Sequence, residues 1–170
     1  MAVETLMRDF VAALHSTSHL WLAITFYVSL YVAFATHELG HYFVARVFGL
    51  RVSRLVVGSY GPICVKRYRG TLFVFRCIWL PWGAEYIRLK DPRDESEIRN
   101  QLAAVLSAGI ATNMLCAGLF AVMNMWLHSQ TVAIFELVAF ATGVGQLIPI
   151  GASDGQLIWN HYRHGRMHKG

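Results

Sequence analysis

The sequence of 170 residues is poor in charge: 15% of its residues are Asp, Glu, Lys or Arg, whereas 55% are hydrophobic. A soluble domain normally carries about 25% charged residues, so this composition argues against an ordinary soluble protein. Cysteine is also scarce, and Cys64, Cys77 and Cys116 lie far apart without paired spacing. Such spacing indicates neither a disulfide framework nor a thiolate zinc site. We interpret the three cysteines as packing residues.

Long apolar runs are what the sequence has instead. Three of them, about residues 20–48, 102–127 and 131–150, are long enough to cross a bilayer as helices. The formal net charge is +5, but the basic residues stand between or after these runs, which membrane topology explains without a nucleic-acid partner. We therefore predict a membrane α-helical bundle with the N-terminus outside and with residues 49–101 and the C-terminus in the cytoplasm.

The segment between the first two runs has a different pattern of hydrophobic residues. Residues 51–90 hold short stretches rich in valine, phenylalanine, isoleucine and tyrosine, separated by glycine and proline. This pattern predicts a small antiparallel sheet or a pair of hairpins on the cytoplasmic side, associated with the membrane. The expected organisation is an amphipathic segment over residues 1–18, without the features of a signal peptide, one membrane domain over 19–158, and a basic cytoplasmic tail over 159–170.

A His-Glu-x-x-His pattern at His37, Glu38 and His41 interrupts the first apolar run. On a helix, residues four apart share a face, so both imidazoles can reach one metal ion. Glu38 stands beside them and can take a proton from the ion's water, which is the general-base arrangement of zinc peptidases. The alternative is a helix with stray polar residues, but ionisable side chains at membrane depth are costly and usually functional.

Two histidines leave a catalytic zinc site incomplete, because such a site usually has three protein ligands. The third ligand must lie at a similar depth, toward the cytoplasmic end of another span. Asp154 meets this condition, and Pro149 before it introduces irregular backbone that can line a wet cavity; a plain helix-ending Asp-Gly turn is the alternative. Glu136 lies near the opposite end of its span, and Glu85 could reach the site only if the sheet folds inward.

Other polar residues have simpler interpretations. Asn113 lies within the second span, where the small residues of the stretch 107–112 let helices approach closely, and an interhelical hydrogen bond worth about 1 kcal/mol explains it. His161, His164 and His168 could form a second metal site, but their spacing suits a flexible, solvated tail better.

Together, these motifs resemble those of the site-2 protease family of intramembrane zinc metalloproteases. Residues 146–155 are similar to the family's Asn-x-x-Pro-x-Pro-x-Leu-Asp-Gly, residues 80–86 to its Pro-x-Gly-Gly segment, and residues 108–113 to its Ala-Gly-Pro-x-x-Asn. The metal positions are intact, and four other positions depart from the family's residues: Ile110 (Pro in the family), Gln146 (Asn), Gly151 (Pro) and Ser153 (Leu).

The resemblance implies an intramembrane zinc endopeptidase in which His37, His41 and Asp154 hold Zn²⁺ and Glu38 is the catalytic base. The implied substrate is a transmembrane segment of another membrane protein, which must unwind before it is cut within or near the bilayer. A strand edge near the Pro-x-Gly-Gly-like segment could pair with the unwound chain. Five residues are candidates for binding it: Gly83, Glu85, Asn113, Gln146 and Pro149.

The alternative function is a non-catalytic metal-binding membrane scaffold that retains the protease fold. The sequence favours the enzyme, because a scaffold has no need of Glu38. At this length we expect neither a PDZ-like insertion nor a nucleotide-sensing tail, and we expect a protein of a prokaryotic inner membrane. The expected partners are a substrate helix and the lipid bilayer, and the sequence is also compatible with a homo-oligomer.

Overall fold

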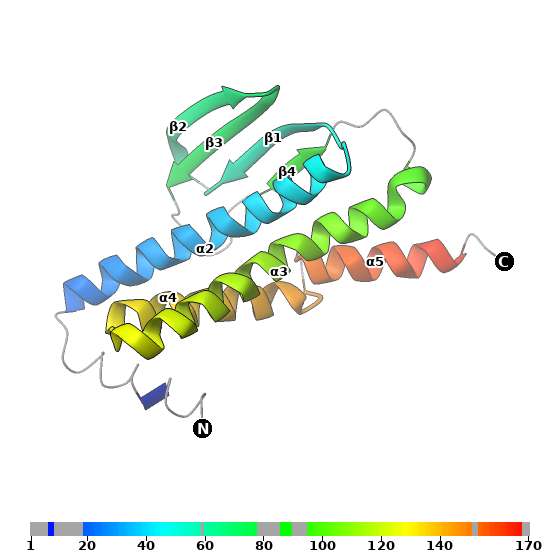
Figure 1. Cartoon of the computed structure of the whole chain (residues 1–170). Helices are drawn as coiled ribbons and strands as arrows, with labels where there is room; N and C mark the ends of the chain where they lie inside the picture. Colours follow the sequence, from blue (N-terminus) through cyan, green and yellow to red (C-terminus); the bar gives the residue numbers. More distant parts are fainter. Residues whose placement is uncertain are drawn as a thin grey trace.

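The computed structural model of the chain describes residues 7–8, 19–58, 60–77, 86–89, 95–150 and 153–167. Helices α2, α3 and α4 lie side by side, and a small sheet covers one side of α2 (Figure 1). The elements are, in chain order, α2 (His19–Val47), β1 (Val52–Val57), β2 (Tyr60–Tyr68), β3 (Thr71–Cys77), β4 (Tyr86–Leu89), α3 (Glu95–Leu127), α4 (Gln130–Leu147) and α5 (Asp154–Met167).

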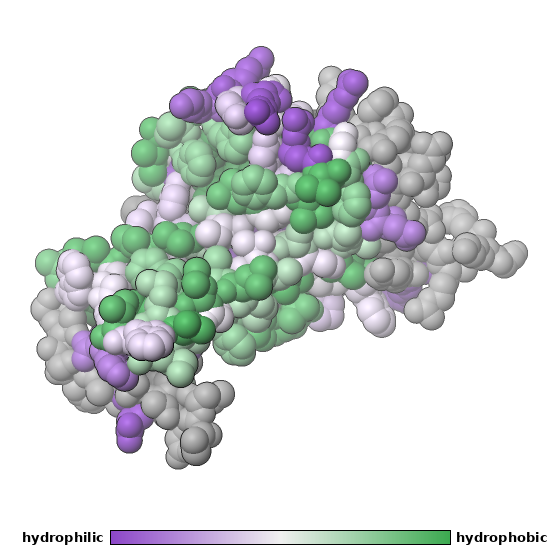
Figure 2. Space-filling model, in the orientation of Figure 1, coloured by the Kyte–Doolittle hydropathy of each residue, from purple (hydrophilic) through white to green (hydrophobic). Residues whose placement is uncertain are grey.

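The helices α2, α3 and α4 are each long and apolar enough to cross a membrane. Many of their large apolar side chains are exposed, among them Trp21, Phe26, Leu115, Leu119 and Phe140. Figure 2 shows hydrophobic side chains over the helices and hydrophilic ones gathered over the outer part of the sheet. A soluble monomer rarely exposes so much contiguous apolar surface. The three predicted apolar helices are therefore confirmed.

The turn between α4 and α5 fixes where Asp154 lies. The backbone of Ile148 is extended, with φ −71° and ψ 123°, as expected for a residue that precedes a proline, here Pro149. Ser153 then caps α5: its Oγ accepts a hydrogen bond from the backbone N–H of Gln156 at 3.2 Å. Asp154 is consequently the first residue of α5 and lies on the side of the bundle that carries the end of α4.

The predicted tail over residues 159–170 is helical as far as residue 167, because α5 continues to Met167. Leu157 and Trp159 are exposed on this helix, while α3 and α4 contact it. Local sequence gives little sign of this helix, since it contains two glycines. Capping by Ser153 and packing on the bundle stabilise it instead.

The four strands form one sheet in the order β2-β3-β1-β4. The strands β2 and β3 form an antiparallel hairpin, and β1 pairs with β4 in antiparallel fashion, but β1 and β3 are parallel. The predicted sheet is thus confirmed in its existence, while the prediction that it is antiparallel is wrong for its central pair.

The short link between β1 and β2 explains this topology. It resembles a hairpin turn in the sequence, yet it carries the chain across the end of β3, so that β2 begins with Tyr60 opposite Cys77. Gly58 lies in this link at φ +91°, and a Cβ there would be 2.7 Å from the carbonyl carbon of Arg76. Glycine is required because the crossing chain touches the backbone of β3 and takes a left-handed conformation.

The sheet packs on the C-terminal half of α2, the half that carries the histidines. The ring of Phe73 on β3 lies 5.2 Å from that of Tyr42 on α2, centroid to centroid. The buried members of this core are Tyr42, Ala45, Leu50, Val52, Leu55, Val57 and Val105. This core therefore holds the histidine-bearing part of α2 between the sheet and α3.

The strand β2, at the edge of the sheet, is exposed along its whole length. Cys64 on β2 is therefore exposed, so its interpretation as a packing residue is wrong. Cys77 and Cys116 are half-buried, as packing residues can be, and all three cysteines are free thiols.

Candidate active site

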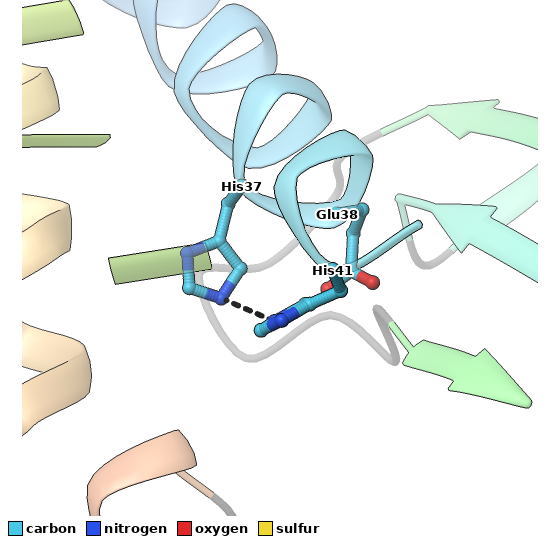
Figure 3. Close-up of side chains that lie close together, drawn as sticks. All are labelled: His37, Glu38 and His41. Atoms are coloured by element: carbon cyan, nitrogen blue, oxygen red, sulfur yellow. Dashed lines mark hydrogen bonds between the residues drawn. The ribbon is translucent and has the colours of Figure 1, made fainter. Parts of the chain in front are cut away.

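The α2 helix places His37, Glu38 and His41 in the interior, with 4%, 5% and 3% of their surfaces exposed. The two imidazoles face each other edge to face, and their Nε2 atoms are 3.1 Å apart (Figure 3). A ligand atom of Glu38 lies within 4.8 Å of those of both histidines. One turn of helix therefore gathers two nitrogen ligands and a carboxylate.

Asp154 reaches the same point from α5. Its Oδ2 atom lies 2.9 Å from Nε2 of His37 and 3.1 Å from Nε2 of His41. In a tetrahedral zinc site with bonds of about 2.0–2.1 Å, neighbouring ligand atoms are about 3.3 Å apart. The three atoms therefore have nearly the spacing of one face of such a site, and Asp154 fits this spacing more closely than Glu38 does.

The charge state of Asp154 suits a metal ligand. Burial raises the pKa of its carboxyl group, but hydrogen bonds and charge interactions with His37 and His41 lower the pKa more strongly, to about 2. Asp154 is thus ionised at neutral pH, and a carboxylate must be ionised to bind a metal ion.

The backbone of α3 sets the tautomer of His41. Nδ1 of His41 lies 2.6 Å from the carbonyl oxygen of Val105. A carbonyl oxygen only accepts, so Nδ1 carries a proton. In the neutral imidazole, the form that binds a metal ion, Nε2 then presents its lone pair toward His37 and Asp154. A metal-binding histidine usually donates its other N–H in this way. Electron-rich atoms about 3 Å apart repel one another unless a proton or a metal cation lies among them, so the residues present fit a metal ion.

The carboxylate of Glu38 remains available for other chemistry. Its Oε2 atom is buried and has no hydrogen-bond partner within the described part of the chain. A buried carboxylate without a partner is costly unless water or substrate reaches it. Beside the proposed ligands, it can accept a proton from a water molecule.

Two residues hold the backbone around Asp154. The side-chain oxygen of Gln146 accepts a hydrogen bond from the N–H of Asp154 at 3.3 Å. Gly155 abuts the end of α4, where a Cβ would lie 2.7 Å from the carbonyl carbon of Leu147. Gln146 was predicted to contact substrate; in the structure it supports Asp154, and a substrate role for it stays a prediction.

Asn113 links three helices next to the site. Its side chain is fully buried, its Nδ2 donates to Oγ1 of Thr142 on α4 at 3.1 Å, and its Oδ1 accepts from Oγ1 of Thr36 on α2 at 3.4 Å. This arrangement supports the interhelical hydrogen bond that the sequence suggested as the simpler interpretation. The predicted substrate contact of Asn113 remains untested.

Replacing Asn113 by alanine is expected to destabilise the helix bundle by about 1 kcal/mol, because one interhelical hydrogen bond of this kind contributes about that much. Thr142→Val removes the same bond from its other end, so the double variant should be scarcely less stable than either single variant. Unfolding in mild detergent measures all three. Fully additive losses would contradict the link, and normal cleavage by Asn113→Ala would also remove Asn113 from the candidate substrate contacts.

The remaining predicted residues fall into two groups. Pro149 is exposed at the turn after α4, where it ends the helix. Gly83 and Glu85 lie outside the described residues, as do the side chains of the tail histidines His161, His164 and His168.

Sequence reasoning missed two residues that touch the imidazoles, Val105 and Gly109. Val105 acts through its backbone carbonyl, which leaves no signal in a sequence. The small residues around Gly109 predict that helices approach closely, but they do not say which side chains lie opposite.

Comparison with known proteins relates this site to a family. A family model described as peptidase family M50 matches residues 25–129, which is more than half of the chain and includes His37, Glu38 and His41. The chain belongs to peptidase family M50. The site-2 protease resemblance is thereby confirmed. Asp154 lies beyond the residues that the M50 model matches, so its place beside the histidines is known from the structure.

Curated relatives of this M50 chain are bacterial. It is 36% identical over 124 residues to "Protease RseP" of Yersinia pestis and 35% identical over 124 residues to "Regulator of sigma-E protease RseP" of Escherichia coli K12, covering 65% of this chain and 26% of each relative. It is 31% identical over 169 residues to a "Putative zinc metalloprotease" of Xylella fastidiosa, covering 89% of this chain and 35% of that relative. The chain thus spans about a quarter to a third of these relatives.

Proposed function

We propose that this M50 chain is an intramembrane zinc endopeptidase that cuts a transmembrane segment of another membrane protein within or near the bilayer. The observation that carries the proposal is the meeting of Asp154 with His37 and His41, with every pair of ligand atoms within 3.1 Å and the Oε2 atom of Glu38 beside them, which has no partner in the described part of the chain. A non-catalytic scaffold would need the three ligands but not Glu38.

Three apolar helices and their exposed apolar surface support a place in the bilayer, and bacterial relatives support an inner membrane. Basic residues outnumber acidic ones in 49–101, so we place that segment and the C-terminus in the cytoplasm and the N-terminus outside. The site lies near the C-terminal end of α2 and beside the start of α5. Hydrolysis would therefore occur toward the cytoplasmic side.

His37, His41 and Asp154 would hold the zinc ion. When bound, zinc acidifies water and polarises the carbonyl of the peptide bond to be cut. Glu38 takes the proton from the attacking water and later gives it to the leaving amine. Burial of Glu38 favours the first step, because a carboxylate with little competing solvation accepts a proton more readily.

The substrate must reach this site in extended form, since the peptide bonds of a helix are shielded by their own hydrogen bonds. Among the described strands, β4 lies at the edge of the sheet next to β1, and it contacts α2, the helix that carries the site. An edge strand presents unpaired backbone groups that an extended peptide can join. We propose that the substrate pairs along this edge.

Removing the metal from the purified full chain in liposomes is expected to stop cleavage of a model transmembrane substrate, and stoichiometric Zn²⁺ is expected to restore it. The reason is that neither the water nor the carbonyl is activated without the ion. The control is the same chelator already saturated with zinc. Cleavage that continues after zinc has been removed would contradict the proposal. A zinc-loaded chain that never cleaves would favour the scaffold.

A further inference from the structure

We propose that Gly109 on α3 is a positioning residue of the metal centre: its missing side chain leaves the space in which both imidazoles lie, and any larger residue would push them off Asp154. The inference rests on the proposed zinc site. In this inference α3 provides no ligand in the described structure, but it fixes the orientation of two ligands.

The contacts of Gly109 carry the inference. A Cβ at this position would lie 2.5 Å from Cε1 of His41, 2.6 Å from Cε1 of His37 and 2.6 Å from Nε2 of His41. Carbon contacts below 3.0 Å essentially do not occur, so something must move. The three nearest atoms all belong to the imidazoles, and one of them is a proposed ligand atom.

The imidazole of His41 has little freedom to move away. Nδ1 of His41 is held by the carbonyl of Val105, one turn before Gly109 on the same helix. Asn113, one turn after Gly109, ties α3 to α2 and α4. The helix axis is thus fixed on both sides of Gly109. An added methyl group would therefore turn the rings and separate their Nε2 atoms from Oδ2 of Asp154, instead of shifting the helix.

Two other glycines provide matched controls. Gly118 lies on the same helix, and a Cβ there meets nothing within 4 Å. Gly40 on α2 is a site of helix packing: a Cβ there would meet the side chain of Thr112 and, at 2.8 Å, the carbonyl oxygen of Ala108, and none of its three nearest atoms belongs to an imidazole. A packing role and a positioning role can therefore be compared in one protein.

The experiment measures zinc affinity and the visible absorption of Co²⁺ bound in place of zinc, which reports ligand geometry and does not depend on cleavage. Gly109→Ala is expected to lower zinc affinity about ten- to a hundredfold, the usual effect of disturbing the groups that orient a ligand, and to change the Co²⁺ spectrum. Gly118→Ala should match the parent chain. Gly40→Ala should lower the unfolding temperature with a smaller effect on the spectrum of the folded fraction.

If Gly109→Ala does not fold, a second comparison tests whether the added methyl group strikes the imidazoles. In a chain that already carries His37→Ala and His41→Ala, the added methyl group should cost no stability, because the atoms it would strike are gone. Destabilisation by Gly109→Ala in that background, or an unchanged zinc affinity and Co²⁺ spectrum in the folded single variant, would overturn the proposal. Because no readout depends on cleavage, failure here is distinguishable from failure of the proposed protease activity.

Discussion

Glu38→Gln is expected to lower the cleavage rate about 10²- to 10⁴-fold while zinc stays bound. Glutamine has nearly the shape of glutamate, so the buried site keeps its packing. Its amide cannot take a proton from water, and general-base catalysis typically contributes a factor of this size. The measurements are the rate of cleavage of a model transmembrane substrate in liposomes and the zinc content per chain.

The matched control for this substitution is Glu136→Gln on α4. Glu136 is also a glutamate within an apolar helix, but it lies in the first half of α4, whereas the site lies beside the C-terminal end of that helix, where Gln146 contacts Asp154. Its replacement should leave the cleavage rate unchanged. Unchanged turnover by Glu38→Gln would reject the mechanism. Loss of zinc from Glu38→Gln would instead make Glu38 a ligand, which its distance from the two histidines allows.

Asp154→Ala is expected to remove most of the bound zinc and all measurable cleavage. The substitution leaves two histidines, and zinc sites of enzymes usually have three protein ligands. The loss of affinity should exceed the about 10- to 100-fold expected when only a supporting hydrogen bond is lost. Zinc content after dialysis against a weak chelator measures it.

Asn160→Ala serves as the control for Asp154→Ala. Asn160 is an exposed polar residue on the same helix α5, and its Oδ1 accepts a hydrogen bond from Nε2 of Gln156 at 2.8 Å. Its replacement should leave zinc content unchanged. Full zinc occupancy of Asp154→Ala would mean that the third ligand is misassigned, and the meeting of Asp154 with the histidines would then have a purely structural purpose.

Prediction of the fold succeeded for those elements whose secondary structure follows from the residues of one continuous segment. The three apolar helices follow from runs of residues whose burial in lipid needs no partner. The parallel pairing of β1 and β3 could not be predicted, because alternation along a strand reports which face is buried and carries no information about the neighbouring strand or its direction. The helical α5 was missed for a similar reason: its stability comes from capping and packing.

The sequence by itself determined the chemistry of the site: two imidazoles one helical turn apart and a carboxylate beside them, a relation set by the period of the α-helix alone. Tertiary structure decided the rest. It brought Asp154 from another helix to within 3.1 Å of both histidines, gave His41 its acceptor on Val105, and placed Gly109 against the rings. These relations depend on how helices cross, and the crossing is fixed by contacts between residues that lie far apart in the chain.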